Sequence, residues 1–323
     1  MQTLTPGEVR KRFGKMFSRS FFTLVDEKRG LVQIIEKCSV KGPVEWDAIN
    51  RMRAGGALRS VDIDGTTLVM NAKIGKGRVN FGPVSKTSGG QALKSVVVRG
   101  DEVLTTWAGL AGASVGVGAC LPQSPGVLRA MYHVRRSGEI RLGGSNAIEV
   151  TIVSPRRVRL LIGIDDTDTK EKGATWVLAL KLAEALEREI PGARHLHHRI
   201  VQLNPDIREK TTNCASTVVS FAVKEKVIGK SIGFAKKFLK KSTFSDNTAI
   251  AVFTGLVIPQ KLKQYGLDAK RKRLGIDAAL KVAGACGVGL IEITGSRGAV
   301  GALAAIGCFD MGPRAAGLHG EKF

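Results

Sequence analysis

The feature that most constrains the fold is a change of pattern at Arg157. Residues 157–164, RVRLLIGI, form a nearly continuous apolar run, which is typical of a strand buried on both faces. In residues 173–189, apolar side chains then recur at helical spacing, at Val177, Leu180, Ala183 and Leu186. A buried strand followed by an amphipathic helix predicts a sheet with helices packed on it.

The same alternation continues to the end of the sequence. Apolar strand patterns are followed or preceded by helical ones, and a lysine-rich helix ends near Lys241. The expected strands cover residues 195–204, 215–223, 248–257 and 288–294, and the further expected helices cover residues 261–272, 276–285 and 299–307. The sequence therefore predicts an α/β fold for this half of the chain.

The first half has a different pattern. Short β-branched runs broken by glycine and proline predict a strand-rich α+β domain over residues 1–147, with a hairpin turn at Asp64-Gly65. Near the start, Phe13, Phe17 and Phe21 recur every four residues among basic side chains. We expect the apolar stripe of a helix there, and base stacking is the alternative. Residues 134–147 are polar and contain glycine, and they are the expected linker.

The composition favours a polyanionic partner. The chain carries 50 Lys+Arg against 28 Asp+Glu, a formal charge of +22. Such a field favours RNA, DNA or a large anionic cofactor, although a generally basic proteome is an alternative cause. No apolar run approaches the roughly 18 residues needed to cross a bilayer, so we expect no membrane insertion and a cytoplasmic location. The five cysteines are widely spaced without a CxxC pair, so no structural zinc is expected.

Three carboxylates follow the buried strand at its end. Asp165, Asp166 and Asp168 repel one another and need a cation or hydrogen-bond donors to remain ionised together. Oxygen ligands at such a turn suit Mg²⁺, and the N-terminus of the helix beyond Gly173 is a phosphate site, with Lys172 offsetting phosphate charge. The alternative is an ordinary capped turn, because Asp and Thr are common capping residues.

A second polar segment, residues 202–217, precedes the next strand. Asn204-Pro205 marks a turn, and Lys210 and Thr211 offer a cation and a hydroxyl donor. If this segment packs beside the acidic turn, the two together would orient a triphosphate. Alone, it would be a polar loop.

Three motifs in this order resemble a known family. GIDDTD (163–168), VQLNPDIREKT (201–211) and GSRGAVGALAAIG (295–307) look like the catalytic core of archaeal tRNA(Ile) agmatidine synthetase, over residues 159–309. With its additional first half, the whole chain resembles methanogenesis marker protein 11, a family of methane-producing archaea. The resemblance implies a kinase-like ATP- and Mg-binding core over residues 157–245, followed by a ferredoxin-like subdomain over residues 246–323.

The resemblance also implies a cofactor set and residue roles. ATP and Mg²⁺ are the expected cofactors, and Asp165, Asp166 and Asp168 would hold the metal. The catalytic residues would be Asp165, Asp166, Thr175 and Lys210. The nucleotide would contact Thr167, Lys172, Gly173, Asn204, Thr211, Arg297 and Gly298.

This sequence departs from the family pattern in several places. The acidic loop has one residue more before Gly173, Trp176 replaces a small or hydroxyl residue, and Thr212-Asn213-Cys214 replaces a basic, glycine-containing continuation. The sequence ends at Phe323 without the OB-fold and zinc ribbon that grip tRNA, so we do not expect agmatidine synthesis itself.

The expected function is Mg-ATP-dependent phosphotransferase or ligase-like activation of an unidentified acceptor, with RNA as one candidate. The alternative is a non-catalytic RNA-binding protein, or an enzyme-maturation or assembly factor related to methanogenesis. The corresponding partner is a polyanion, RNA above all, or a methanogenesis enzyme complex.

Overall fold

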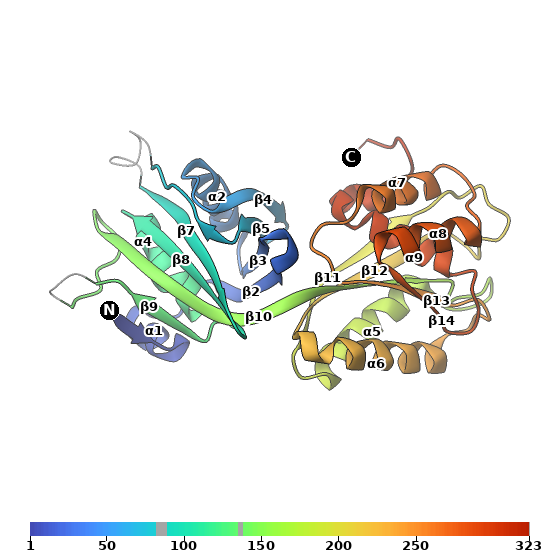
Figure 1. The fold of residues 1–323 in the computed structure, drawn as a ribbon, viewed down its shortest axis with the longest axis horizontal. Coiled ribbons are helices and arrows are strands. Elements are labelled where there is room, and N and C mark those ends of the chain that lie inside the picture. The colour runs from blue at the N-terminus through green and yellow to red at the C-terminus, as the bar shows by residue number, and fades with distance from the viewer. Residues whose placement is uncertain (82–88, 135–137, 323) are drawn as a thin grey trace. The chain divides into compact units, whose positions relative to one another are not determined.

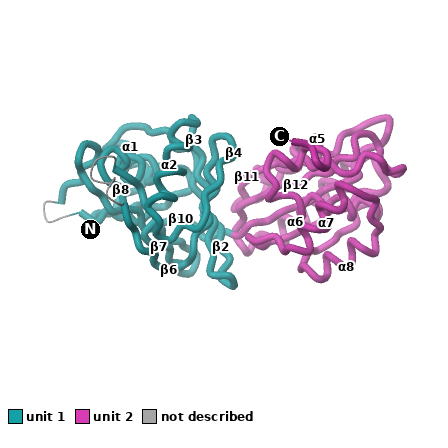
Figure 2. Tube along the Cα trace, turned by 90° about the horizontal axis from the view of Figure 1, so that it is seen from above, with its two compact units in different colours: residues 1–157 teal, residues 158–323 magenta. Residues whose placement is uncertain are grey.

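The structure is a computed structural model that describes residues 1–81, 89–134 and 138–322. The chain divides into two compact units, Met1–Arg157 and Val158–Phe323 (Figure 2). Helices and strands occur in both units, which confirms the α/β class, and the N-terminal unit is rich in strands (Figure 1). None of the helices in the described ranges is both long and apolar enough to cross a membrane.

The N-terminal unit contains two antiparallel sets of strands, which a short parallel pairing joins into one sheet. The first has the spatial order β1 (Gln2–Leu4), β9 (Arg129–Tyr132), β10 (Ala147–Asp165), β8 (Glu102–Leu110), β7 (Gly90–Arg99) and β6 (Gly75–Lys76). The second has the order β4 (Leu58–Asp64), β5 (Thr67–Lys73), β3 (Leu31–Cys38) and β2 (Ser18–Asp26). The predicted hairpin is confirmed, since Gly65 links β4 to β5 with a positive φ of 59°.

The helices of this unit are α1 (Pro6–Phe13), α2 (Lys41–Arg53) and the short α4 (Ala113–Val115). The expected helical stripe of phenylalanines is wrong beyond Phe13. The helix ends at Gly14, whose φ of 78° suits glycine, and Phe21 is a fully buried residue of β2. Phe21 and Thr23 are buried in β2 while Phe22 between them is half-buried, and because side chains of a strand repeat with a period of two, spacing by four fits a strand as well as a helix.

Strand β10 belongs to both units. Its first part, to Pro155, pairs with β8, and its last part, from Val158, pairs with β12 (Ala215–Val223). The unit boundary after Arg157 therefore lies inside a strand, past the polar segment 134–147 that we expected to be the linker. Within that segment, residues 135–137 lie outside the described part of the chain.

The C-terminal unit is a five-stranded antiparallel sheet in the order β11 (Ala193–Gln202), β12, β10, β13 (Ala249–Phe253) and β14 (Gly289–Glu292). Each strand overlaps a segment expected from the sequence. Helices α5 (Thr175–Glu189) and α6 (Ile228–Ser242) cover one face, and α7 (Gln260–Ala269), α8 (Ile276–Cys286) and α9 (Ala299–Gly307) cover the other (Figure 1).

The buried run in β10 explains both layers of helices. Leu160, Ile162 and Ile164 pack with α5 and α6, whereas Leu161 packs on the opposite face with α9. Helices packed on a sheet were expected here, and the structure confirms them. The further division of this unit at residue 246 stays a prediction.

Candidate functional site

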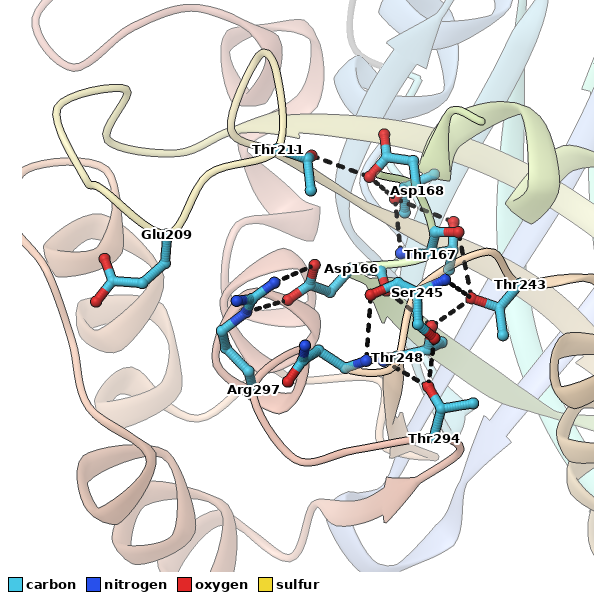
Figure 3. Close-up of polar contacts among 12 residues, drawn as sticks. Asp166, Thr167, Asp168, Glu209, Thr211, Thr243, Ser245, Thr248, Thr294 and Arg297 are labelled. Atoms are coloured by element: carbon cyan, nitrogen blue, oxygen red, sulfur yellow. Dashed lines mark hydrogen bonds and ion pairs between the residues drawn. The ribbon is translucent and has the colours of Figure 1, made fainter. Parts of the chain in front are cut away.

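The acidic turn lies at an edge of the C-terminal sheet where several polar segments meet. Strands β10, β11 and β14 end at this edge, and their antiparallel neighbours β12 and β13 begin there. The segments 166–174, 203–214, 243–248 and 293–298 therefore come together. The sequence left open whether the first two of these segments pack against each other. They do, since the Thr211 hydroxyl donates to Asp168 Oδ1 over 3.0 Å (Figure 3).

Asp166 forms a bidentate ion pair with Arg297. The guanidinium donates from Nε to Oδ2 over 2.6 Å and from Nη2 to Oδ1 over 3.0 Å (Figure 3). Asp166 also has a positive φ of 60°, which non-glycine residues adopt at a cost of about 1–3 kcal/mol and which occurs often at functional sites. Thr248 stabilises this conformation by donating from Oγ1 to the Asp166 carbonyl over 2.7 Å.

Asp168 has a different role from its two neighbours. Only 9% of it is exposed, and its Oδ1 accepts hydrogen bonds from Thr211 and, over 3.4 Å, from Thr175. The Thr175 hydroxyl in turn accepts from the backbone N–H of Thr167 over 3.2 Å. Asp168 and Thr175 therefore tie the acidic turn to the start of α5 and to the loop after β11.

A cluster of hydroxyl side chains supports the turn from the side of β13. It consists of Thr243, Ser245, Thr248 and Thr294, which hydrogen bond to one another or to nearby backbone (Figure 3). Thr243 donates to the carbonyl of Thr167 over 3.2 Å, which fixes the turn directly. The sequence reasoning missed this cluster. The polar run STFSDNT before a strand at the same sheet edge was the available signal.

Asp165 lies beneath helix α9. A Cβ placed on Gly301 would be 1.8 Å from Asp165 Oδ2, and a Cβ on Gly163 would be 2.0 Å from the carbonyl oxygen of Ala302. Glycine at both positions therefore allows α9 to approach the end of β10. Burial, with smaller contributions from Asp166 and Asp168, raises the pKa of Asp165 well above its usual value.

A cavity of about 290 Å³ opens beside Asp165 and Asp166. Five residues predicted for the site line it: Asp165, Asp166, Lys210, Thr211 and Arg297. The sequence reasoning missed Glu209, Arg273, Ser296 and Gly301, which line it as well. Arg273 donates from Nε to Glu209 Oε1 over 2.8 Å. The lining of this cavity thus holds three carboxylates, of which Glu209 pairs with Arg273, and the cationic side chains Lys210, Arg273 and Arg297.

The remaining predicted residues lie around this cavity without lining it. Thr167 and Gly173 line a second cavity of about 340 Å³, whose other walls include Val177, Leu178 and Phe238. The Lys172 ammonium lies 4.7 Å from the centre of the Phe244 ring, a cation–π contact.

Two further predicted residues, Asn204 and Gly298, contact the protein through their backbone. The Asn204 backbone N–H donates to the Ala269 carbonyl over 3.0 Å, which anchors the loop after β11 to the end of α7. Gly298 packs tightly, since a Cβ there would be 2.7 Å from the Asp165 carbonyl oxygen.

Within the described residues, no group of three or more His, Cys, Asp or Glu side chains is arranged to hold a metal ion. Oδ1 of Asp168 is held by Thr175 and Thr211, and metal binding by all three aspartates stays a prediction. Asp165 and Asp166 alone still fit Mg²⁺, which proteins commonly bind through one or two carboxylates plus phosphate oxygens and water. A magnesium ion at these two residues stays a prediction.

Comparison with known proteins places the C-terminal unit in a recognisable class. Residues 161–235 match the family model of the TiaS TCKD domain. The tRNA 2-agmatinylcytidine synthetase TiaS of Pyrococcus horikoshii is 30% identical over 157 residues, and that of Archaeoglobus fulgidus is 33% identical over 153. The matches cover 46% of this chain but only 35% and 36% of those synthetases. A solved complex of TiaS with tRNA and ATP is 28% identical, with a TM-score of 0.43, over 46% of this chain and 36% of that one.

A second relative matches both units. The uncharacterized protein MJ0921 of Methanocaldococcus jannaschii is 35% identical over 289 residues, which is 90% of this chain and 93% of that protein. The chain belongs to the family of this protein. The resemblance to the synthetase core is thus confirmed for the C-terminal half, and the assignment to methanogenesis marker protein 11 stays a prediction.

Proposed function

We propose that the C-terminal unit binds Mg-ATP in the cavity beside Asp165 and Asp166 and uses it to activate an oxygen atom of an acceptor, with RNA as the favoured acceptor. The observation that carries the proposal is the separation of charge in one cavity. Asp165 and Asp166 lie at the end of β10, and Lys210 and Arg297 from other segments line the same cavity, whereas Arg273 is paired with Glu209. A magnesium triphosphate combines a divalent cation, which the carboxylates would hold, with anionic phosphates, which the cationic side chains would contact.

Each side chain has a role in this proposal. Arg297 and Lys210 would contact phosphate oxygens, and the Thr211 hydroxyl would orient them by hydrogen bonding. Asp165 and Asp166 would hold Mg²⁺, which would neutralise part of the phosphate charge. Phosphoryl transfer depends mainly on such positioning and charge stabilisation, so the arrangement suits a phosphotransferase or ligase.

The similarity to the TiaS synthetases supports RNA as the acceptor, since those relatives are tRNA-modifying enzymes by name. A formal charge of +22 favours a polyanion in the same way. We also propose a cytoplasmic location and, from the sequence resemblance, a place among the methanogenesis marker proteins.

Calorimetric titration with Mg-ATP tests nucleotide binding. We expect Asp166→Asn to weaken binding by at least about tenfold, because it removes a charge that pairs with Arg297 and is placed to hold the metal. Glu184→Gln is the matched control, since Glu184 is an exposed carboxylate on α5, and it should bind as the wild type does. Absence of binding at millimolar Mg-ATP, or unchanged binding by Asp166→Asn, would contradict the proposal.

A turnover assay with bulk archaeal tRNA tests the acceptor. We expect tRNA to stimulate ATP consumption by the wild type and not by Asp166→Asn. ADP as the product would indicate phosphoryl transfer. Tight, salt-dependent tRNA binding that is unaffected by Mg-ATP and is accompanied by no turnover would instead indicate the non-catalytic RNA-binding function.

A further inference from the structure

The N-terminal unit has a cavity of its own, of about 530 Å³, which is within the usual size range of small-molecule sites. Helix α2, strand β3 and the helical segment after β8 contribute its walls. Much of the lining is apolar, and polar side chains are grouped together. We call it the N-terminal cavity. It is lined by Phe17, Ser18, Glu36, Cys38, Gly42, Pro43, Val44, Trp46, Asp47, Leu68, Gln91, Gly112, Gly116 and Cys120.

The polar part of the N-terminal cavity carries an excess negative charge. Glu36 and Asp47 both pair with one cation, Arg51, which is fully buried behind them. Arg51 donates to Asp47 Oδ2 over 2.9 Å, to Glu36 Oε2, and from Nε to the Gln91 side-chain oxygen over 3.0 Å. Two ionised carboxylates and one guanidinium leave a net charge of minus one. The Cys120 thiol adds no charge, because burial raises its pKa to about 12 and keeps it neutral.

One carboxylate oxygen of this group has no protein partner. Both oxygens of Asp47 are used, because Gln91 Nε2 donates to Oδ1 over 2.7 Å. Glu36 is only 6% exposed, and among the described residues its Oε1 accepts no hydrogen bond. Glu36 Oε1 is thus a carboxylate oxygen without a protein donor at the wall of a cavity, where a ligand or water can satisfy it.

Two aromatic side chains of the N-terminal cavity are exposed. Phe17 is 55% exposed and Trp46 is 47% exposed, although large aromatic side chains are usually more buried. Aromatic ring faces attract cations and also provide apolar contact. The lining therefore offers a carboxylate acceptor, an excess negative charge and aromatic surface together.

From this combination we infer that the N-terminal cavity binds a small organic cation, an ammonium or guanidinium compound with an apolar body. The cationic group donates a hydrogen bond to Glu36 Oε1 and neutralises the excess charge. The apolar body contacts Trp46, Phe17 and Val44. The site lies in the unit that the TiaS family model does not match.

Ligand-observed NMR titration of the full chain at neutral pH tests the inference, with benzylammonium as the probe. Benzyl alcohol and benzoate have the same ring with a neutral and a negative group. We expect benzylammonium to bind at least about tenfold more tightly than benzyl alcohol, and benzoate not to bind. Glu36→Gln should reduce the preference for the cation to about twofold or less. Equal affinities for the three probes, or no binding by any of them, would overturn the inference.

Two further variants separate the cavity from general surface charge and from folding. Glu45→Gln removes an exposed carboxylate from the same helix, α2, and should leave the preference unchanged. Trp46→Ala removes an exposed side chain and should fold normally while weakening benzylammonium binding about fivefold or more. If Glu36→Gln fails to fold, this variant still decides the matter. Unchanged binding by Trp46→Ala, or loss of the preference in Glu45→Gln, would count against the cavity as the site.

Discussion

Each unit contains an arginine close to two carboxylates, and the two arrangements differ in burial. In the N-terminal unit, Arg51 is fully buried between Glu36 and Asp47. In the C-terminal unit, the Arg297 side chain is 42% exposed beside a cavity, paired with Asp166 and near Asp165. Removing a cation from a low-dielectric interior leaves charge without compensation, whereas water compensates for the loss of an exposed one. We therefore expect Arg51 and its pairs to stabilise the fold, with only Glu36 Oε1 left for a ligand, and Arg297 to be available to a ligand.

The largest expected effect is on Arg51. Arg51→Met should lower the free energy of unfolding by about 3–5 kcal/mol, because Glu36 and Asp47 remain buried without a cation. Arg297→Met should lower it less, by about 1–2 kcal/mol, because Arg297 itself is exposed although its partner Asp166 is largely buried. Urea unfolding followed by circular dichroism measures both. Adding Glu36→Gln and Asp47→Asn to Arg51→Met should recover part of the loss, and equal losses in the two single variants would show that burial does not distinguish the clusters.

An intermediate effect is expected at Gly163, since backbone packing places the second cluster. An added Cβ would be 2.0 Å from the Ala302 carbonyl oxygen, so Gly163→Ala must displace α9. We expect a loss of about 1–3 kcal/mol in the free energy of unfolding, the usual cost of overpacking. Gly284→Ala on α8 is the control, because its Cβ meets nothing within 4 Å and alanine favours helix. Thermal unfolding of both variants tests this, and a neutral Gly163→Ala would contradict the close approach.

The sequence predicted the second cluster better than the first. Asp165, Asp166 and Asp168 are adjacent in the sequence, follow a buried strand and draw attention by their mutual repulsion. Periodicity also located the strands and helices of the C-terminal unit, because they are long and strongly patterned. Glu36, Asp47 and Arg51 gave no such signal. Asp47 and Arg51 are four residues apart on the helix α2. Glu36 and Gln91 come from the strands β3 and β7, and only tertiary packing brings these two residues to Arg51.

At the candidate site too, the features that the sequence did not predict depend on tertiary packing. Lys210 and Thr211 were predicted because they lie in a polar segment before a strand, whereas Arg273 follows α7 and belongs to none of the predicted motifs. The different role of Asp168 could not be predicted either. Its orientation depends on hydrogen bonds from Thr175 and Thr211, and sequence spacing does not specify side-chain direction.

The last expected effect is a pH dependence specific to the first cluster. Burial, opposed by Arg51 and Gln91 and increased by Glu36, raises the pKa of Asp47 to about 6; Cys120, also nearby, stays neutral. Because the folded state then holds this proton more tightly than the unfolded state, the Asp47 contribution to stability is greatest below about pH 4 and falls as the pH rises to about 6.

Asp47→Asn should remove this contribution. The difference in free energy of unfolding between wild type and variant should therefore move against the wild type between about pH 4 and pH 6.5. Urea unfolding at closely spaced pH values measures the difference, and it cancels the carboxylates that the two proteins share. Asp62→Asn, at an exposed position on β4, should show no such trend. A difference that is constant with pH would mean that Arg51 keeps Asp47 ionised throughout this range, and that the excess charge of the first cluster persists in acid.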